Sequence, residues 1–336
     1  WRGTTSTLLS FGDQDDGEGE LVGQPHQGLA CMFHMMNEAR IGVGMGAVMY
    51  GYRGYLASLQ YARERLQGRP PAAKDPLQPQ VPLVAHADVR RMLLAQKAYV
   101  EGAFALGLYA ARLVDEQRTG TSEAARAEAG LLLDLLTPIV KSWPAQWCLE
   151  ANSLAIQIHG GYGYTREYPV EQFWRDNRLN MIHEGTHGIQ AADLLGRKVL
   201  MENGRGMQLL SARMQATMAQ AVAVPELAAY AAQLGDALQQ VGAATQAAWA
   251  TGNPAEALAN AVPYMQAFGH TVLAWVWLDV ALATLRADAT LSIAASAGRM
   301  GAARYFYHYE LPKIGAWLNV VNSRDTTCAA LSEAAF

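Results

Sequence analysis

Long segments with helical periodicity, separated by very few breaks, dominate the first half of the chain. Apolar side chains such as Met36, Ile41 and Met49 recur at roughly helical spacing. This pattern stops at residues 68–83, which hold five prolines and therefore form a loop rather than a helix or a central strand. The first half is accordingly predicted to form three long helices, at residues 28–67, 86–117 and 122–159.

Helices are also expected along the rest of the chain, which is rich in alanine and leucine and poor in β-branched clusters. Ser122 is an N-cap residue by type, and Pro138 and Pro144 are expected to kink the helix that follows it. The glycine-rich GGYGY stretch forces a turn. Beyond it, helices are predicted at residues 171–177, 186–202, 206–220, 225–248, 254–286, 288–298 and 301–322.

The first 28 residues differ in character from the rest. Short apolar runs at 7–11 and 20–22 are split by glycine and acidic residues, which is typical of strands and turns. The chain is therefore predicted to be mainly α, with a short β remnant, a four-helix-bundle-like domain and an additional helical domain. The expected boundaries place these units at residues 1–28, 29–203 and 204–336.

Charge, cysteine content and apolar runs argue against several other classes of protein. The formal net charge is −4, which disfavours a broad nucleic-acid surface, and the three cysteines form no CxxC pair. No signal peptide is recognisable. The apolar stretch 261–285 is broken by polar residues such as His270 and Asp279, so a core helix is predicted there and no transmembrane segment is expected.

The segment 155–190 holds the residues best suited to chemistry. Gly160, Gly161 and Gly163 allow a tight turn and close approach of the backbone to a ligand. Glu184 precedes a helix start and follows the apolar Met181 and Ile182, so its carboxylate can be desolvated and become a better base.

Thr186 and two histidines of this segment have side chains suited to helix capping or metal binding. Thr186 is placed to cap the helix, whose first amides favour a nearby anion. From the residues alone, a structural turn and a solvated glutamate stay open as alternatives. His183 and His187 are four residues apart, but Gly185 lies at a loop-to-helix junction between them, so no metal site is expected.

This segment resembles the C-terminal signature of the acyl-CoA dehydrogenase family. In that family a Q-x-x-GG-x-G-[YF] turn, an E-Y-P-[VA]-E stretch, an R-D pair and an E-G-T helix start follow in this order. Residues 37–40 and 61–68 resemble two further family elements, and the block after residue 204 resembles the larger members. The four signature motifs stand here at residues 157–164, 167–171, 175–176 and 184–186.

The resemblance implies specific tasks for these residues. Glu184 would remove the α-proton of an acyl-CoA thioester while N5 of FAD accepts the β-hydride, giving a trans-2-enoyl-CoA, with the Glu184 N–H as a donor to the thioester carbonyl. Contacts to FAD are implied for Arg65 (toward the pyrophosphate of a neighbouring subunit), Gln157, Gly160, Gly161 and Thr186. The acyl and CoA channel would be lined by Asn37, Arg40 and Gly185. The base is thus expected beside the dinucleotide groove formed by residues 157–164.

The same resemblance implies partners and a compartment. These are an acyl-CoA substrate, an electron-transferring flavoprotein as electron acceptor, a homodimer or dimer of dimers, and bacterial cytoplasm or mitochondrial matrix rather than secretion. Three alternatives stay open: an acyl-CoA oxidase, a nucleic-acid-associated relative, and a non-catalytic oligomerisation module. The last arises because the family's N-terminal helical domain and most of its β-domain have no counterpart in the 336 residues.

Some positions depart from the family pattern. Gly68 comes one residue early after Arg65 and the usual phenylalanine is missing, which bears on how far Arg65 reaches. Ala39 stands where a minority of members place their base, which favours Glu184, whereas the neighbouring Glu38 is a rival base.

Overall fold

Helices make up almost all of the regular structure in the computed structural model, which describes residues 5, 7–14, 16–72, 75, 77–287 and 290–336. Within these described residues, β pairing is limited to one isolated bridge between Leu66 and Pro82, at the two ends of the proline-rich loop. The predicted mainly α class is confirmed.

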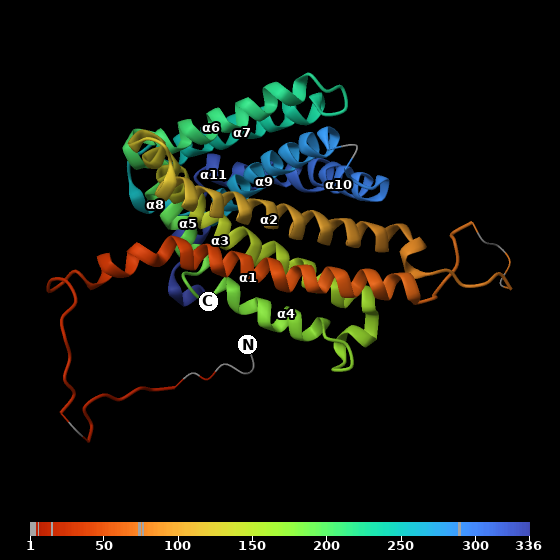
Figure 1. Cartoon of the computed structure of the whole chain (residues 1–336), viewed down its shortest axis with the longest axis horizontal. Helices are drawn as coiled ribbons and strands as arrows, with labels where there is room; N and C mark the ends of the chain where they lie inside the picture. Colours follow the sequence, from red (N-terminus) through yellow and green to blue (C-terminus); the bar gives the residue numbers. More distant parts are fainter. Residues whose placement is uncertain (1–4, 6, 15, 73–74, 76, 288–289) are drawn as a thin grey trace.

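The first part of the chain forms an elongated helical bundle (Figure 1). Gly44 and Gly54 of α1 face Val140 and Asn152 of α3, so these two helices run parallel. Helix α2 packs against both of them and runs in the opposite direction. The short α4 returns along α1 and α3. The bounds are α1 (Gly28–Glu64), α2 (Ala87–Thr119), α3 (Glu123–His159) and α4 (Val170–Arg178).

Helix α3 contains both of its prolines without a break, with Ser122 as its N-cap accepting from the Ala125 amide at 3.1 Å. Proline has no N–H, so Pro144 leaves the carbonyl of Val140 without its helical partner. That carbonyl faces Gly44 of α1, where a side chain would collide with it. The expected kinks are therefore absorbed inside one helix, and the freed carbonyl lies at the contact between α1 and α3.

The helix predicted over 186–202 is shorter than expected. Helix α5 (His187–Gly196) ends where Arg197 leaves the helical region, and a 3-10 turn (Lys198–Leu200) follows. Helix α6 (Met201–Val222) then begins with positive φ angles at Glu202, Asn203 and Gly204. This sharp change of direction lies at the predicted boundary near residue 203.

The remaining helices form a second bundle packed on the first. The helix predicted over 254–286 is split near Asn260, and the one predicted over 301–322 is interrupted by a π-helical segment (Phe306–Glu310). Residues 288–289, where another helix was expected to start, lie outside the described residues. The observed helices are α7 (Ala228–Ala248), α8 (Pro254–Leu258), α9 (Ala261–Arg286), α10 (Ile293–Tyr305), α11 (Ile314–Asn322) and α12 (Thr327–Ala330).

Helix α9 is the buried centre of this second bundle. By length and composition it could cross a membrane, but 78% of its most apolar window is buried inside the structure. Its Trp277 donates an indole N–H to the Ala98 carbonyl of α2 at 3.1 Å, over the space left by Gly102. The interpretation of this segment as a core helix therefore agrees with its burial, and a single hydrophobic core runs through both bundles.

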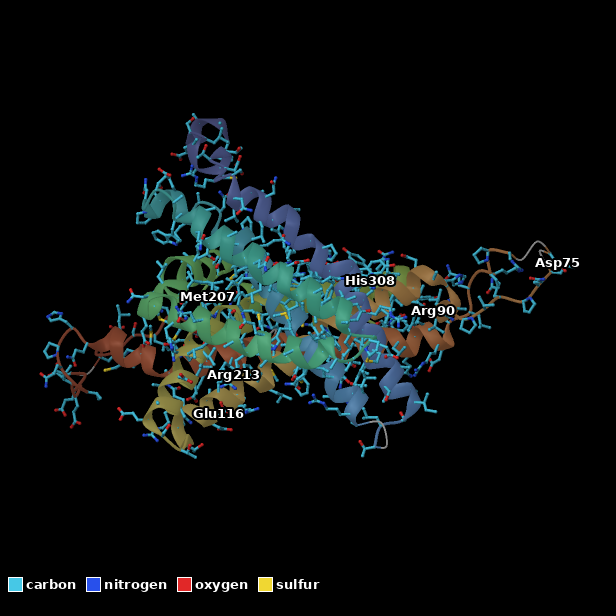
Figure 2. The ribbon with its side chains drawn as sticks, turned by 90° about the horizontal axis from the view of Figure 1, so that it is seen from above. Asp75, Arg90, Glu116, Met207, Arg213 and His308 are labelled. Carbon is cyan, nitrogen blue, oxygen red and sulfur yellow. The ribbon has the colours of Figure 1, made fainter. Side chains whose placement is uncertain are left out.

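The strands predicted in the first 28 residues do not form in the described part of that segment. Residues 7–14 and 16–27 are exposed and lack strand structure, and the start of the chain lies outside the described residues. A strand requires a neighbouring strand for its backbone hydrogen bonds, and none is available here. The loop that carries Asp75 likewise extends away from the bundle, on the side opposite to this segment (Figure 2).

Candidate active site

A buried ladder of asparagines leads from the bundle core to the turn that carries Glu184. Asn177 of α4 donates to the Asn152 side chain of α3 at 2.7 Å and also to the Ala47 carbonyl of α1. Asn180 donates in turn to Asn177 at 3.0 Å, and a ring nitrogen of His183 lies 3.1 Å from the Asn180 oxygen. Because the three asparagines are fully buried, the ladder fixes the start of the turn.

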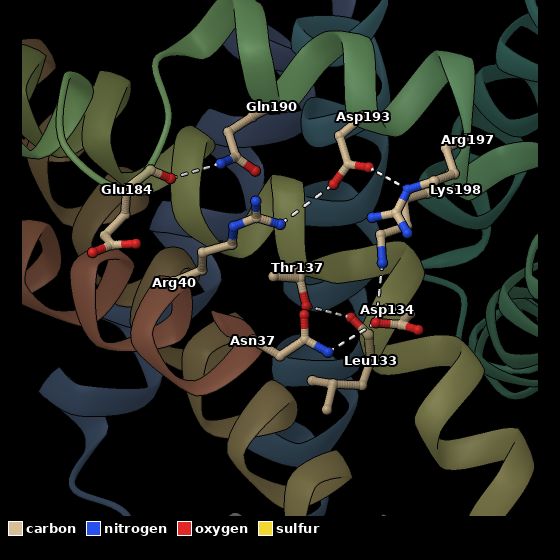
Figure 3. Close-up of polar contacts among 10 residues, drawn as sticks. All are labelled: Asn37, Arg40, Leu133, Asp134, Thr137, Glu184, Gln190, Asp193, Arg197 and Lys198. Carbon is tan, nitrogen blue, oxygen red and sulfur yellow. Dashed lines mark hydrogen bonds and ion pairs between the residues drawn. The ribbon is translucent and has the colours of Figure 1, made fainter. Parts of the chain in front are cut away.

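The turn itself has an unusual backbone that two buried side chains hold in place. Glu184 adopts a φ of 55° and Gly185 a φ of 92°, and left-handed backbone at a non-glycine residue requires support. Gln190 donates to the Glu184 carbonyl at 2.9 Å (Figure 3). The ammonium of Lys141 donates to the Gly185 carbonyl at 2.6 Å. Two consecutive carbonyls are thus fixed from the protein side.

The carboxylate of Glu184 is exposed, contrary to the predicted desolvation. Ile182 beside it is also exposed, because the turn lies at the surface of the bundle, and in Figure 3 the carboxylate makes no contact with the residues drawn. Within the described residues, nothing accepts the Glu184 backbone N–H either. Glu184 therefore combines an exposed side chain with a backbone N–H that has no partner among the described residues.

Two titratable groups behind the turn have perturbed pKa values. Burial lowers the pKa of Lys141 to about 8, Arg40 lowers it further, and Glu184 opposes the shift. Burial also lowers the pKa of His187 to about 4, assisted by Lys141 and Arg178. Both ring nitrogens of His187 are buried without a partner among the described residues. The protein side of the turn is therefore positively charged and poor in water.

The two polar residues of α1 predicted to line the substrate channel are engaged by the protein itself. Arg40 is 7% exposed and forms an ion pair with Asp193 at 3.3 Å, and Asn37 donates to Asp134 at 2.8 Å (Figure 3). Asp134 is also paired with Lys198 at 3.0 Å. These contacts tie α1 to α3 and α5, which favours a structural task for Arg40 and Asn37 over a substrate contact.

Four of the five residues predicted to contact FAD lie at the other end of the bundle, whereas Thr186 lies with the Glu184 turn. Gly160, with a φ of 61°, and Gly161 have no atom within 4 Å of the position where a side chain would begin. Gln157 and Arg65 are exposed beside them. The Arg65 guanidinium lies 5.7 Å from the Tyr162 ring centre and forms no ion pair with a described carboxylate. This end of the bundle thus presents an open glycine turn and an available cation.

A groove of about 460 Å³ runs next to this turn. Stacked rings form its wall, with the Tyr61 and His159 ring centres 4.3 Å apart and Tyr168 edge-on to Tyr61. Arg53 and Phe173 also line the groove, with the Arg53 guanidinium 5.7 Å from the centre of the Phe173 ring. A planar aromatic or phosphate-bearing ligand would find stacking partners and the Arg53 guanidinium here.

The structure does not bring the two groups of predicted site residues together. Lys141, under the Glu184 turn, and Gln157 are sixteen residues apart on the same helix, α3. At 1.5 Å per residue this places them about 24 Å apart. Glu184 is therefore not beside the groove of its own chain, in contrast to the prediction.

Thr186 stands at the N-cap position of α5, as predicted, but its hydroxyl makes no capping hydrogen bond. The first amides of α5 are left open to an anion as a result.

Among the residues that the structure describes, no cluster of three or more histidine, cysteine or acidic side chains could hold a metal ion.

The contacts of Lys141 and Gln190 with the Glu184 turn were not predicted from the sequence. A lysine inside the apolar stretch LLTPIVKSW is the one available signal, because a charge in such a run is costly to bury. Their contact with the turn joins residues far apart in the chain, and no local pattern encodes it.

Comparison with known proteins gives two family matches that together span most of the chain. Residues 26–200 match the acyl-CoA dehydrogenase C-terminal domain, and residues 210–332 match the domain described as acetyl-CoA dehydrogenase C-terminal like. The first match alone covers more than half of the 336 residues, which is sufficient to identify the family.

Individual relatives agree with these matches. The chain is 38% identical over 296 residues to 3-methylmercaptopropionyl-CoA dehydrogenase of Ruegeria pomeroyi, covering 86% of this chain and 49% of the relative. It is 32% identical over 343 residues to a broad-specificity linear acyl-CoA dehydrogenase of Mycobacterium tuberculosis, covering 98% and 56%. The chain therefore spans about half the length of the curated relatives it matches.

The fold is similar to that of a solved relative. The crystal structure of an acyl-CoA dehydrogenase from Bacillus anthracis, complexed with FAD, superposes with a TM-score of 0.69 at 20% identity, covering 88% of this chain and 50% of that one. With the two domain matches, the fold leads to one conclusion: the chain belongs to the acyl-CoA dehydrogenase family.

Proposed function

We propose that this chain supplies the catalytic base and part of the FAD site for α,β-dehydrogenation of an acyl-CoA thioester. The observation that carries the proposal is the Glu184 turn. There a carboxylate and an unpartnered backbone N–H project from the same residue, on a backbone that Gln190 and Lys141 hold rigidly. A base and an oxyanion donor fixed relative to each other are what removal of a thioester α-proton requires.

In the proposed step, the substrate loses a proton from its α carbon and a hydrogen with its electron pair from its β carbon. The α C–H bond breaks toward the Glu184 carboxylate, which takes the proton, while the Glu184 N–H donates to the thioester oxygen as negative charge grows on it. The double bond forms between the α and β carbons. Bound FAD supplies the acceptor for the β-hydrogen and its electron pair.

The residues at the far end of the bundle fit the dinucleotide half of FAD. The space over Gly160 and Gly161 is open, so a phosphate-bearing ligand could approach their backbone closely. Arg65 is exposed and free of carboxylate partners in the described structure, and a planar guanidinium suits a pyrophosphate. Gln157 adds an exposed amide. Thr186, in contrast, lies with the Glu184 turn, where the α5 amides would face an anionic group.

The separation of about 24 Å along α3 between Lys141, beneath the proposed base, and Gln157, beside the glycine turn, favours a site shared between two protomers. In this arrangement Glu184 of one protomer and the glycine turn of its partner serve the same FAD. A homodimer or a dimer of dimers satisfies this requirement. It would also cover the exposed Glu184 carboxylate with ligand and protein, which supplies the water-poor surroundings that the described residues do not.

The proposed substrates are acyl-CoA thioesters, with electrons passed to an electron-transferring flavoprotein. The relative with 38% identity is named for 3-methylmercaptopropionyl-CoA, which makes this thioester the first to test, with butyryl-CoA as a straight-chain comparison. An oxidase would instead pass electrons directly to oxygen. Turnover with an artificial acceptor under nitrogen, compared with hydrogen peroxide release in air, separates the two.

The test of the base uses Glu184→Gln in the full-length flavin-loaded protein. Removal of a general base should lower kcat by about 10²–10⁴-fold, while the yellow flavin is retained. The matched control is Glu38→Gln, which alters the rival carboxylate, ion-paired with Arg118, and should leave kcat nearly unchanged. Normal turnover in Glu184→Gln, or loss in Glu38→Gln alone, would refute the assignment.

A second test addresses the cofactor contacts. Arg65→Ala should release flavin more readily, measured as loss of visible absorption after gel filtration. Arg69→Ala, an exposed arginine four residues further along, is the control and should retain flavin. Equal retention in both variants would contradict the contact of Arg65 with FAD.

A further inference from the structure

The environment of Lys141 is unusual for a lysine. Its side chain is fully buried in the middle of α3, yet no carboxylate in the described part of the chain forms an ion pair with it. A buried, unpaired ammonium is costly, because the charge loses its hydration without a compensating partner. Lysine is therefore a poor choice at this position unless its charge serves a purpose.

Among the residues that the structure describes, the ammonium makes one hydrogen bond, to the carbonyl of Gly185 at 2.6 Å. Gly185 directly follows Glu184, and both residues have left-handed backbone angles that cost free energy without support. The support is specific, because Gln190 holds the Glu184 carbonyl and Lys141 holds the next one. Lys141 thus fixes the peptide through which Glu184 is attached to α5.

The charges around Lys141 come from three elements packed against it. Arg40 faces it from α1, Glu184 and His183 lie on the turn, and His187 lies at the start of α5. Glu184 is the one acidic group among them, and it opposes the lowering of the Lys141 pKa. Because Lys141 lies beneath a surface turn, it approaches the base from the protein side and leaves the outer side to substrate.

We propose that Lys141 is a positioning residue for the base: its buried ammonium holds the Glu184 turn in its left-handed conformation and keeps a positive charge behind the carboxylate. This inference rests on the proposed function of Glu184. It adds that Glu184 is held in position to act as the base only while Lys141 is protonated. Burial lowers the pKa of Lys141 to about 8, so the ammonium is lost as the pH rises through that value.

The first experiment compares Lys141→Met with the unaltered full-length protein, using butyryl-CoA and an artificial electron acceptor. Methionine keeps the buried stem but removes the charge. We expect kcat to fall by about 10–100-fold with KM changed little, because positioning affects the chemical step more than binding. The unaltered protein should lose activity above about pH 8, and the variant should lack this alkaline limb.

Stability provides a readout that a purely structural lysine would not give. Replacing this buried unpaired charge with an apolar side chain of similar size removes its desolvation cost, which we expect to outweigh the loss of the single hydrogen bond to Gly185. The variant should therefore keep its flavin absorption and show a Tm equal to or higher than that of the unaltered protein. A variant that is slow, unstable and depleted of flavin would instead assign Lys141 to the core alone and overturn the proposal.

A second variant covers the case in which Lys141→Met does not fold. Lys141→Ala removes a fragment equivalent to propylammonium, so adding propylammonium to the assay should restore part of kcat. Propanol, which has a similar size and no charge, is the control and should restore nothing. Equal effects of both additives, or none, count against the proposal.

The outcomes also separate this inference from the function on which it rests. If Glu184→Gln keeps normal turnover, the proposed function fails. If Glu184→Gln is inactive while Lys141→Met retains both kcat and the alkaline limb, the function stands and the positioning by Lys141 is wrong.

Discussion

The contact between α1 and α3 predicts opposite effects for two alanine substitutions in the same helix. At Gly44 an added side-chain carbon would lie 2.0 Å from the Val140 carbonyl oxygen, whereas at Gly42 nothing lies within 4 Å. The clash involves backbone, because Pro144 leaves the Val140 carbonyl free to face α1. To restore a contact of 3.0 Å, the two helices would have to separate by about 1 Å.

The magnitudes follow from these two environments. Gly42→Ala should stabilise the chain by about 0.5–1 kcal/mol, because alanine loses less backbone entropy in a helix. Gly44→Ala gains the same amount but overpacks the contact, which costs about 1–3 kcal/mol or more. The variants should therefore differ by about 2 kcal/mol, or about 4–8 °C in Tm for domains of this size.

Thermal unfolding followed by circular dichroism at 222 nm, with both variants and the unaltered chain in one buffer, measures this difference. The added carbon at Gly44 would also lie 3.5 Å from the Lys141 Cα, so the helix shift should disturb the Glu184 turn and slow turnover in the full-length protein. If Gly44→Ala proves as stable as Gly42→Ala, the close approach of the helices is not as described and the reasoning fails.

Two further predictions concern buried polar groups. Asn177→Ala leaves the Asn152 oxygen and the Asn180 amide without these partners, so the free energy of unfolding measured in urea should fall by about 2–4 kcal/mol. The control Asn319→Ala alters an exposed residue and should change it very little. Burial lowers the pKa of His187 to about 4, so stability should be full above pH 6.5 and fall by up to about 1 kcal/mol per unit toward pH 4. His187→Gln should flatten this slope, and an unchanged slope would show that other groups cause it.

The fold was predictable where local patterns decide it and less so where packing does. Helical periodicity and the proline-rich loop place the three long helices within a few residues of their observed bounds. The breaks at Arg197 and Asn260 were missed, because neither position carries a proline and both turns serve contacts between helices. The strands expected near the start needed partners that the described chain does not contain, so their local pattern alone was insufficient.

The site shows the same division between local and distant information. The E-G-T motif identifies Glu184 and its left-handed neighbour because a glycine turn before a helix is encoded within three residues. Its support is not local: Lys141 reaches Gly185 across 44 positions, from the part of α3 that packs closely against Gly44 of α1. If Glu184 is the base as proposed, substitutions far from it that widen the contact between α1 and α3 should slow proton removal without altering any residue that touches substrate.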